Sequence, residues 1–140
     1  MGEDMVLTYQ VDSDDFTRAG EASSSLKRTL KQLGIPADII RRISIVMYEG
    51  EINMVIHAHG GTITVTIGDE GVEMVLKDTG PGIPDIEKAM QAGWSTASGA
   101  ARNLGFGAGM GLPNMKKCAD TLDIESTVGV GTTVTAVVRL

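Results

Sequence analysis

The chain has 140 residues, of which 42 % are hydrophobic and 21 % are charged. This composition is typical of a globular protein, and the length suits one core, so we expect a single domain over residues 1–140. The formal net charge of −6 argues against nucleic acid as a partner, because binding a phosphate backbone requires a clustered positive surface.

The first part of the chain has the pattern of one strand followed by two helices. Residues 5–11 favour a short strand, and the side-chain oxygens of residues 12–14 can cap the helix that follows. Apolar side chains at helical spacing over residues 16–33 predict this first helix. Gly34 can end it, and a second helix is expected over about 36–57.

The rest of the chain begins with a predicted hairpin. Threonine and apolar residues alternate over 62–67, and after a turn at 69–71 the alternation continues over 72–76. The segments expected next are, in order, a short helix near 84–91, a Gly-, Ala- and Ser-rich stretch over 93–109, a helix near 111–121, and strands near 122–127 and 132–140.

This order of elements predicts an α+β fold. Sequential strands joined by tight turns favour a mixed, mostly antiparallel sheet, and the helices can pack on one of its faces. We therefore expect a two-layer α/β sandwich without an internal repeat or a second domain.

Basic residues are concentrated in the first third of the chain. Such a concentration is either a solvated helix face or a docking patch for an acidic protein partner. The residues concerned are Arg18, Lys27, Arg28, Lys31, Arg41 and Arg42.

The sequence has the features expected of a cytoplasmic protein. Cys118 is the only cysteine, so an intramolecular disulfide is excluded and a reducing compartment fits. No stretch approaches the roughly 18 apolar residues of a spanning helix, and residues 1–4 are acidic, unlike a secretory signal. We expect no membrane partner.

Two polar residues of the second helix are candidates for chemistry. Glu49 and Asn53 are four residues apart within an apolar stripe, so they lie on the same helical face. Either Glu49 reaches solvent at the edge of the stripe, or Asn53 supplies an oxygen to Mg²⁺ while Glu49 accepts a proton from an attacking hydroxyl or water. Glu51 lies on another face, where we expect it to be solvated. Gly50 costs a helix about 1 kcal/mol relative to Ala, which would be explained by a closely packed neighbour.

A second candidate follows the hairpin. By strand alternation, Asp78 points to the same face as the apolar residues before it. An inward carboxylate at the end of a strand suits a fixed donor such as the exocyclic amine of adenine, and Gly80 and Gly82 permit close approach to a flat ring. The alternative is a plain Asp/Gly/Pro loop.

A third candidate is the run of alternate glycines over residues 105–111, just before a predicted helix. Backbone amides of such a run can hold phosphates, although a flexible segment without a ligand would have the same composition. Neither a Walker loop nor a Rossmann fingerprint is present. His57 and His59 lack the additional ligands that a metal site requires.

Taken in order, these motifs resemble the signature of the GHKL (Bergerat-fold) ATPase superfamily. That signature is Glu-x-x-x-Asn on a helix, then Asp-x-Gly-x-Gly, a lid, Gly-x-Gly-x-Gly-Leu and Gly-Thr. The corresponding segments of this chain are residues 49–53, 78–82, 107–112 and 131–132.

Within the superfamily, the chain most resembles the small anti-sigma-factor and switch-protein serine kinases. This resemblance rests on the Asp-x-Gly-Pro-Gly-Ile-Pro-Asp run at 78–85, the Gly-Trp-Ser-Thr at 93–96 and the Gly-Leu-Pro at 111–113. Gly50 and Glu51 depart from the small or apolar residues that the family usually has between its Glu and its Asn.

The resemblance implies a role for each matched residue. Glu49 would be the general base, Asn53 the magnesium ligand and Asp78 the carboxylate that reads adenine. The cofactors would be ATP and Mg²⁺. The residues implied to contact ATP are Asn53, Asp78, Gly80, Gly82, Ile83, Gly107, Gly109, Met110, Gly111, Leu112 and Thr132.

The implied function is a protein serine/threonine kinase that phosphorylates a small antagonist protein and binds a regulatory, sigma-factor-like partner. The alternative is a nucleotide-gated, anti-sigma-like binding module without phosphotransfer. A histidine-kinase fragment is disfavoured, because both histidines follow Asn53 and no upstream helix carries an acceptor His. An ATPase without a protein substrate stays open, as does a homodimer.

Overall fold

In the part of the chain that the structure describes, five strands form one sheet in the order β1-β2-β3-β5-β4, and every neighbouring pair is antiparallel. The arrangement comes from a computed structural model that describes residues 4–12, 20–57, 60–80 and 111–140. The strands are β1 (Met5–Val11), β2 (Gly61–Ile67), β3 (Gly71–Asp78), β4 (Thr121–Thr127) and β5 (Gly131–Arg139).

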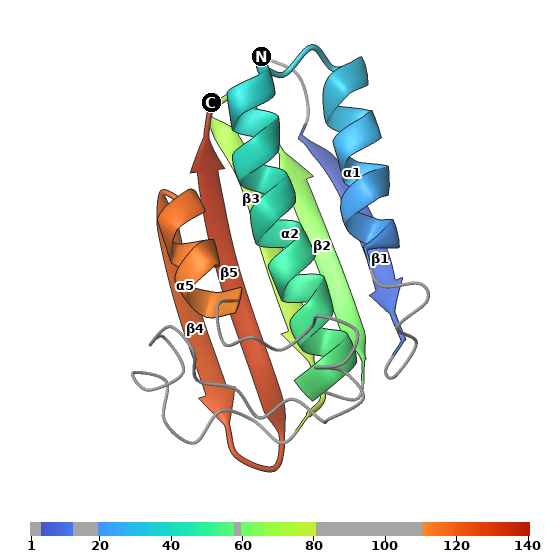
Figure 1. The fold of residues 1–140 in the computed structure, drawn as a ribbon, viewed down its shortest axis with the longest axis vertical. Helices are drawn as coiled ribbons and strands as arrows, with labels where there is room; N and C mark the ends of the chain where they lie inside the picture. The colour runs from blue at the N-terminus through green and yellow to red at the C-terminus, as the bar shows by residue number, and fades with distance from the viewer. Residues whose placement is uncertain (1–3, 13–19, 58–59, 81–110) are drawn as a thin grey trace.

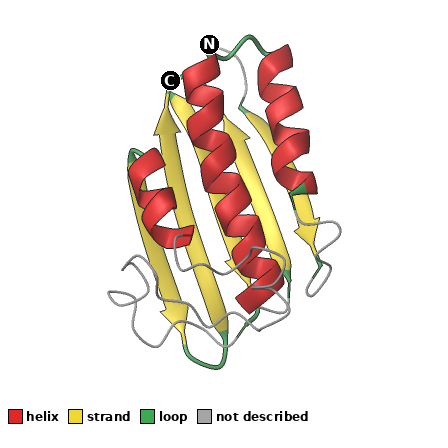
Figure 2. Cartoon of the chain, in the orientation of Figure 1, coloured by secondary structure: helices red, strands yellow, loops and turns green. Residues whose placement is uncertain are grey.

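Three described helices, α1 (Glu21–Gln32), α2 (Ala37–His57) and α5 (Gly111–Cys118), cover one face of the sheet (Figures 1 and 2). The long helix α2 lies in the middle of this layer, between α1 and α5 (Figure 1). The predicted two-layer α+β sandwich is confirmed. Within the described part of the chain, none of the helices is long and apolar enough to cross a membrane.

The described sheet contains no parallel pair, and the connections explain why. β2 and β3 form a hairpin, as do β4 and β5. Between β1 and β2 the chain passes through two helices of opposite direction (Figure 1), so it returns to the end at which β1 finished. β2 then runs against β1, with Met5 opposite Ile67 and Val11 opposite Gly61.

Two helix boundaries differ from the sequence prediction. Helix α1 begins at Glu21, because Gly20 before it has a left-handed φ of 97° that a helix cannot contain. Helix α5 ends at Cys118, short of the predicted Thr121. Residues 16–19 of the predicted first helix, the capping candidates at 13 and 14, and the predicted short helix near 84–91 lie outside the described residues.

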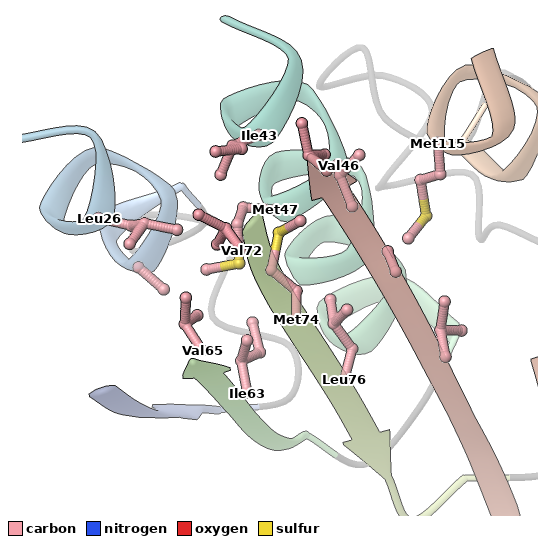
Figure 3. Packing of buried hydrophobic residues seen from close by; sticks show 14 of the residues in the cluster. Leu26, Ile43, Val46, Met47, Ile63, Val65, Val72, Met74, Leu76 and Met115 are labelled. Atoms are coloured by element: carbon pink, nitrogen blue, oxygen red, sulfur yellow. The ribbon is translucent and has the colours of Figure 1, made fainter. Parts of the chain in front are cut away.

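The hydrophobic core lies between the helices and the sheet (Figure 3). Alternate residues of β2 and β3 face it, as the period of two requires. Helix α2 contributes its inner stripe, and α1 and α5 close the two sides. Fully buried side chains labelled in Figure 3 include Leu26, Ile43, Met47, Ile63, Met74 and Met115.

Gly50 allows α2 to lie close to its neighbours, as its position in the helix suggested. A Cβ atom at Gly50 would overlap Cδ2 of Leu76 on β3 and would lie 3.6 Å from Cε of Met115 on α5. Because Leu76 is itself buried, it has little room to move. The cost of a glycine in this helix therefore has a packing reason.

One of the clustered basic residues has a structural role. Arg42 donates from Nε to the carbonyl of Cys118 at 2.9 Å and forms an ion pair with Asp120 at 3.2 Å. The Asp120 carboxylate also accepts the backbone N–H of Arg139 at 2.6 Å. This bond and the Arg42 guanidinium lower the pKa of Asp120. Arg42 thus connects α2 to the end of α5 and to the outer hairpin.

Candidate functional site

The candidate residues that the structure describes gather at one end of the sandwich. Glu49 and Asn53 lie on the C-terminal half of α2, Asp78 is the last residue of β3, and Thr132 is the second residue of β5. The C-terminal ends of α2 and β3 and the N-terminal ends of β5 and α5 all lie at the lower end of the molecule in Figure 1. Hydrogen bonds at this end join residues up to 65 positions apart in the chain.

Asp78 is held by the neighbouring strand. Its Oδ1 accepts the backbone N–H of Thr132 at 3.0 Å, and the hydroxyls of Thr132 and Ser126 are 2.9 Å apart. Gly131 makes this contact sterically feasible, because a Cβ atom there would overlap the carbonyl oxygen of Asp78. The orientation of the half-buried carboxylate is therefore fixed, and a carboxylate has about four lone-pair sites, so a second donor can be accepted.

Glu49 is half-buried and contacts helix α5. Asn114 donates from Nδ2 to Glu49 Oε1 at 3.4 Å, which is long for a hydrogen bond. Sequence reasoning missed Asn114. The sequence does contain a signal for it: Asn114 is a polar amide that lies between the apolar residues Leu112 and Met115, and both of these belong to the core.

The expectation that Glu51 is solvated is wrong. Its side chain is only 3 % exposed, and its two carboxylate oxygens accept the backbone N–H groups of Ala22 and Ser23, each at 3.1 Å. The first N–H groups of a helix have no partner within it, and Gly20 at the cap position has no side chain to offer. Glu51 on α2 supplies the missing acceptor, and its negative charge interacts favourably with the positive end of the α1 helix dipole.

The two glutamates of helix α2 therefore have different surroundings. Glu49 contacts α5, whereas Glu51 binds the start of α1. Burial raises the pKa of Tyr48, which directly precedes Glu49 in the sequence, and the charges of Glu49 and Glu51 raise it further. The phenol is already neutral at pH 7 at its ordinary pKa, so it can donate a hydrogen bond there.

Asn53 is the candidate magnesium ligand. Its side chain is half-buried, and an amide oxygen is a hard ligand of the type Mg²⁺ prefers. The described residues contain no group of three or more His, Cys, Asp or Glu side chains that could hold a metal alone. This donor set fits Mg²⁺ bound together with a nucleotide, because Mg²⁺ commonly keeps several waters and shares substrate phosphates.

The remaining candidates are only partly described. Gly80 is buried two residues after the end of β3, Gly111 is the first residue of α5, and Leu112 packs into the core with 8 % exposure. The other predicted ATP contacts, Gly82, Ile83, Gly107, Gly109 and Met110, lie outside the described residues.

Comparison with known proteins agrees with this arrangement. Residues 38–140 match the family described as histidine kinase-, DNA gyrase B-, and HSP90-like ATPase. The serine/threonine-protein kinase RsbT of Bacillus subtilis is 32 % identical over 115 residues, covering 79 % of this chain and 80 % of that protein. The anti-sigma F factor of Geobacillus stearothermophilus is 35 % identical over 109 residues, covering 74 % and 71 %. The anti-sigma F factor of Bacillus subtilis is 32 % identical over 128 residues, covering 87 % and 81 %. The chain therefore belongs to the histidine kinase-, DNA gyrase B- and HSP90-like ATPase family.

Proposed function

We propose that residues 1–140 form one ATPase domain that acts as a protein serine/threonine kinase. It transfers the γ-phosphoryl group of ATP–Mg²⁺ to a small antagonist protein and also binds a regulatory, sigma-factor-like protein. The proposal is supported by the family and by relatives named as a serine/threonine-protein kinase and as anti-sigma F factors. The observation that carries it is the pair of half-buried residues Glu49 and Asn53 on α2, near the end of the sheet that holds Asp78.

In the proposed reaction, the acceptor Ser or Thr oxygen forms a bond to the γ-phosphorus while the bond to the β–γ bridging oxygen breaks and ADP leaves. Glu49 accepts the proton of the attacking hydroxyl, and Asn114 orients the Glu49 carboxylate. Asn53 holds Mg²⁺, which when bound neutralises charge on the phosphates. Most of the rate acceleration then comes from positioning and charge stabilisation.

Asp78 is proposed to accept the exocyclic amine of adenine. Asp78→Asn should weaken ATP binding about ten- to a hundredfold, since a hydrogen bond to a charged group is worth about 1.5–3 kcal/mol. The variant should fold, because the Asn oxygen can still accept the N–H of Thr132. GTP has a carbonyl where adenine has its amine, so wild-type protein should bind GTP poorly. Calorimetry measures both, with the exposed Asp123→Asn as a control; equal affinities for ATP and GTP would remove this assignment.

Asn53 is proposed to bind the magnesium ion that accompanies ATP. Asn53→Ala should therefore abolish the increase in ATP affinity that Mg²⁺ produces, because the variant lacks the oxygen ligand. Titration of ATP with and without Mg²⁺ measures this difference, and Gln32→Ala at the exposed end of α1 is the control. If Asn53→Ala keeps the wild-type Mg²⁺ dependence, another group holds the ion.

The second candidate function is a binding module without phosphotransfer, which the names of the anti-sigma F factor relatives favour. Incubation with ATP labelled at the γ-phosphate, together with co-purifying proteins, distinguishes the two. Label on a Ser or Thr of a bound protein supports the kinase. Stable binding without any transfer supports the binding module, and free phosphate alone indicates an ATPase.

A further inference from the structure

A groove of about 790 Å³ runs between α1 and α2, which lie side by side in Figure 1. Its apolar part is formed by Ile35, Ile40 and Ile45, of which Ile40 is buried and the other two are half-buried. Glu49, the proposed general base, lines the groove as well. The groove therefore connects an apolar surface to the proposed reaction site.

The charge of this groove is opposite to that of the chain. The exposed side chains of Lys27, Lys31 and Arg41 line it, and among the described residues that line it Glu49 is the one carboxylate. The whole chain has a net charge of −6. Lys27 and Lys31 are four residues apart, so they project from the same face of α1. A local positive surface on an acidic protein favours an acidic partner.

The spacing along α2 indicates how such a partner would lie. Arg41, Ile45 and Glu49 follow one another at intervals of four residues and form a stripe along the groove. Eight residues of helix span about 12 Å, a distance that an extended chain covers with about four residues. A hydroxyl placed at Glu49 would therefore have neighbours about four residues away beside the basic side chains.

We propose that this groove binds the segment of the protein substrate that carries the acceptor hydroxyl. The segment has apolar side chains for the isoleucine surface and acidic side chains for Lys27, Lys31 and Arg41, about four residues from the Ser or Thr that is phosphorylated. Describing it as the acceptor segment rests on the proposed kinase function. The binding of an acidic, partly apolar segment rests on the groove alone.

Two labelled peptides of about twelve residues test the inference. Both have the same Leu and Ser residues; one carries Glu where its twin carries Lys. The full chain should bind the Glu peptide at least about tenfold more tightly than the Lys peptide, measured by fluorescence anisotropy. Methyl signals of Ile35, Ile40 and Ile45 should shift with the Glu peptide.

A pair of charge-matched variants then locates the binding surface. Neutralising the groove by Lys27→Gln, Lys31→Gln and Arg41→Gln should weaken binding of the Glu peptide about tenfold. The control replaces the exposed Lys77, Lys116 and Lys117 by Gln, which gives the same net charge outside the groove, and should leave binding within about twofold of wild type. With an identified acceptor protein, the groove variant should raise KM for that protein about tenfold and leave kcat unchanged.

The inference is overturned if both peptides bind equally, if the two triple variants lose binding equally, or if the Glu peptide does not bind at about 1 mM. Sedimentation that shows a dimer lost in the groove variant, without any peptide preference, would assign the groove to a second copy and also overturn it. Peptide binding does not require turnover. A groove that selects the Glu peptide while no protein ever becomes labelled would therefore contradict the kinase function and not the groove.

Discussion

Glu49→Gln is expected to slow phosphoryl transfer to a protein acceptor at least about a hundredfold while ATP–Mg²⁺ affinity stays near wild type. Gln keeps the length of the side chain and can still accept a hydrogen bond from Asn114, so the local structure should be retained. What it loses is the basic oxygen that takes the proton of the acceptor hydroxyl. A positioned base typically contributes about 10²–10⁴-fold to the rate.

Single-turnover transfer with labelled ATP measures this rate, and calorimetry measures the affinity. Glu73→Gln is a suitable control. Glu73 is exposed on β3, and its replacement removes the same charge away from the site. Transfer by Glu49→Gln at the wild-type rate would show that Glu49 is not the base. Loss of ATP binding in this variant would instead assign Glu49 to nucleotide binding.

Glu51→Gln is expected to lower the free energy of unfolding by about 2–3 kcal/mol, an effect on stability that sequence reasoning did not anticipate. The buried carboxylate accepts two N–H groups at the start of α1, one with each oxygen. Gln offers one oxygen and places an NH₂ group against the other donor. One N–H group of α1 is then left buried without an acceptor, and the favourable interaction with the helix dipole is lost.

Chemical denaturation measures this effect as a lower midpoint at an unchanged m-value. Glu73→Gln again serves as the control and should change the free energy of unfolding by less than about 0.5 kcal/mol. An unchanged midpoint for Glu51→Gln would contradict the capping role. Reduced ATP turnover in this variant at temperatures where it stays folded would indicate that Glu51 also acts on the site.

Local patterns were sufficient for most of the fold. The alternation over 62–67 and 72–76 predicted β2 and β3 correctly, and the apolar stripe of α2 predicted that helix, because each pattern lies within its own element. The start of α1 could not be predicted in this way. The N–H groups at the start of α1 are bound by Glu51, which lies 29 residues after Ala22 and 28 residues after Ser23 in the chain. No local capping motif was therefore present.

The candidate site rests on a different kind of signal. The order and spacing of the motifs selected Glu49, Asn53 and Asp78 as candidates, and their roles stay a prediction. The contacts between the motifs required the three-dimensional structure. The bond from Thr132 to Asp78 and the contact of Asn114 with Glu49 depend on how β5 packs beside β3 and α5 beside α2.

The most direct test of the central claim is a crystal structure of the chain with Mg²⁺ and a non-hydrolysable ATP analogue. The account predicts adenine at Asp78, the metal at the side-chain oxygen of Asn53, and the γ-phosphate facing Glu49, with the α1–α2 groove open towards it. A nucleotide bound elsewhere, or one whose phosphates lie at Asp78 and whose base lies at Glu49, would contradict it.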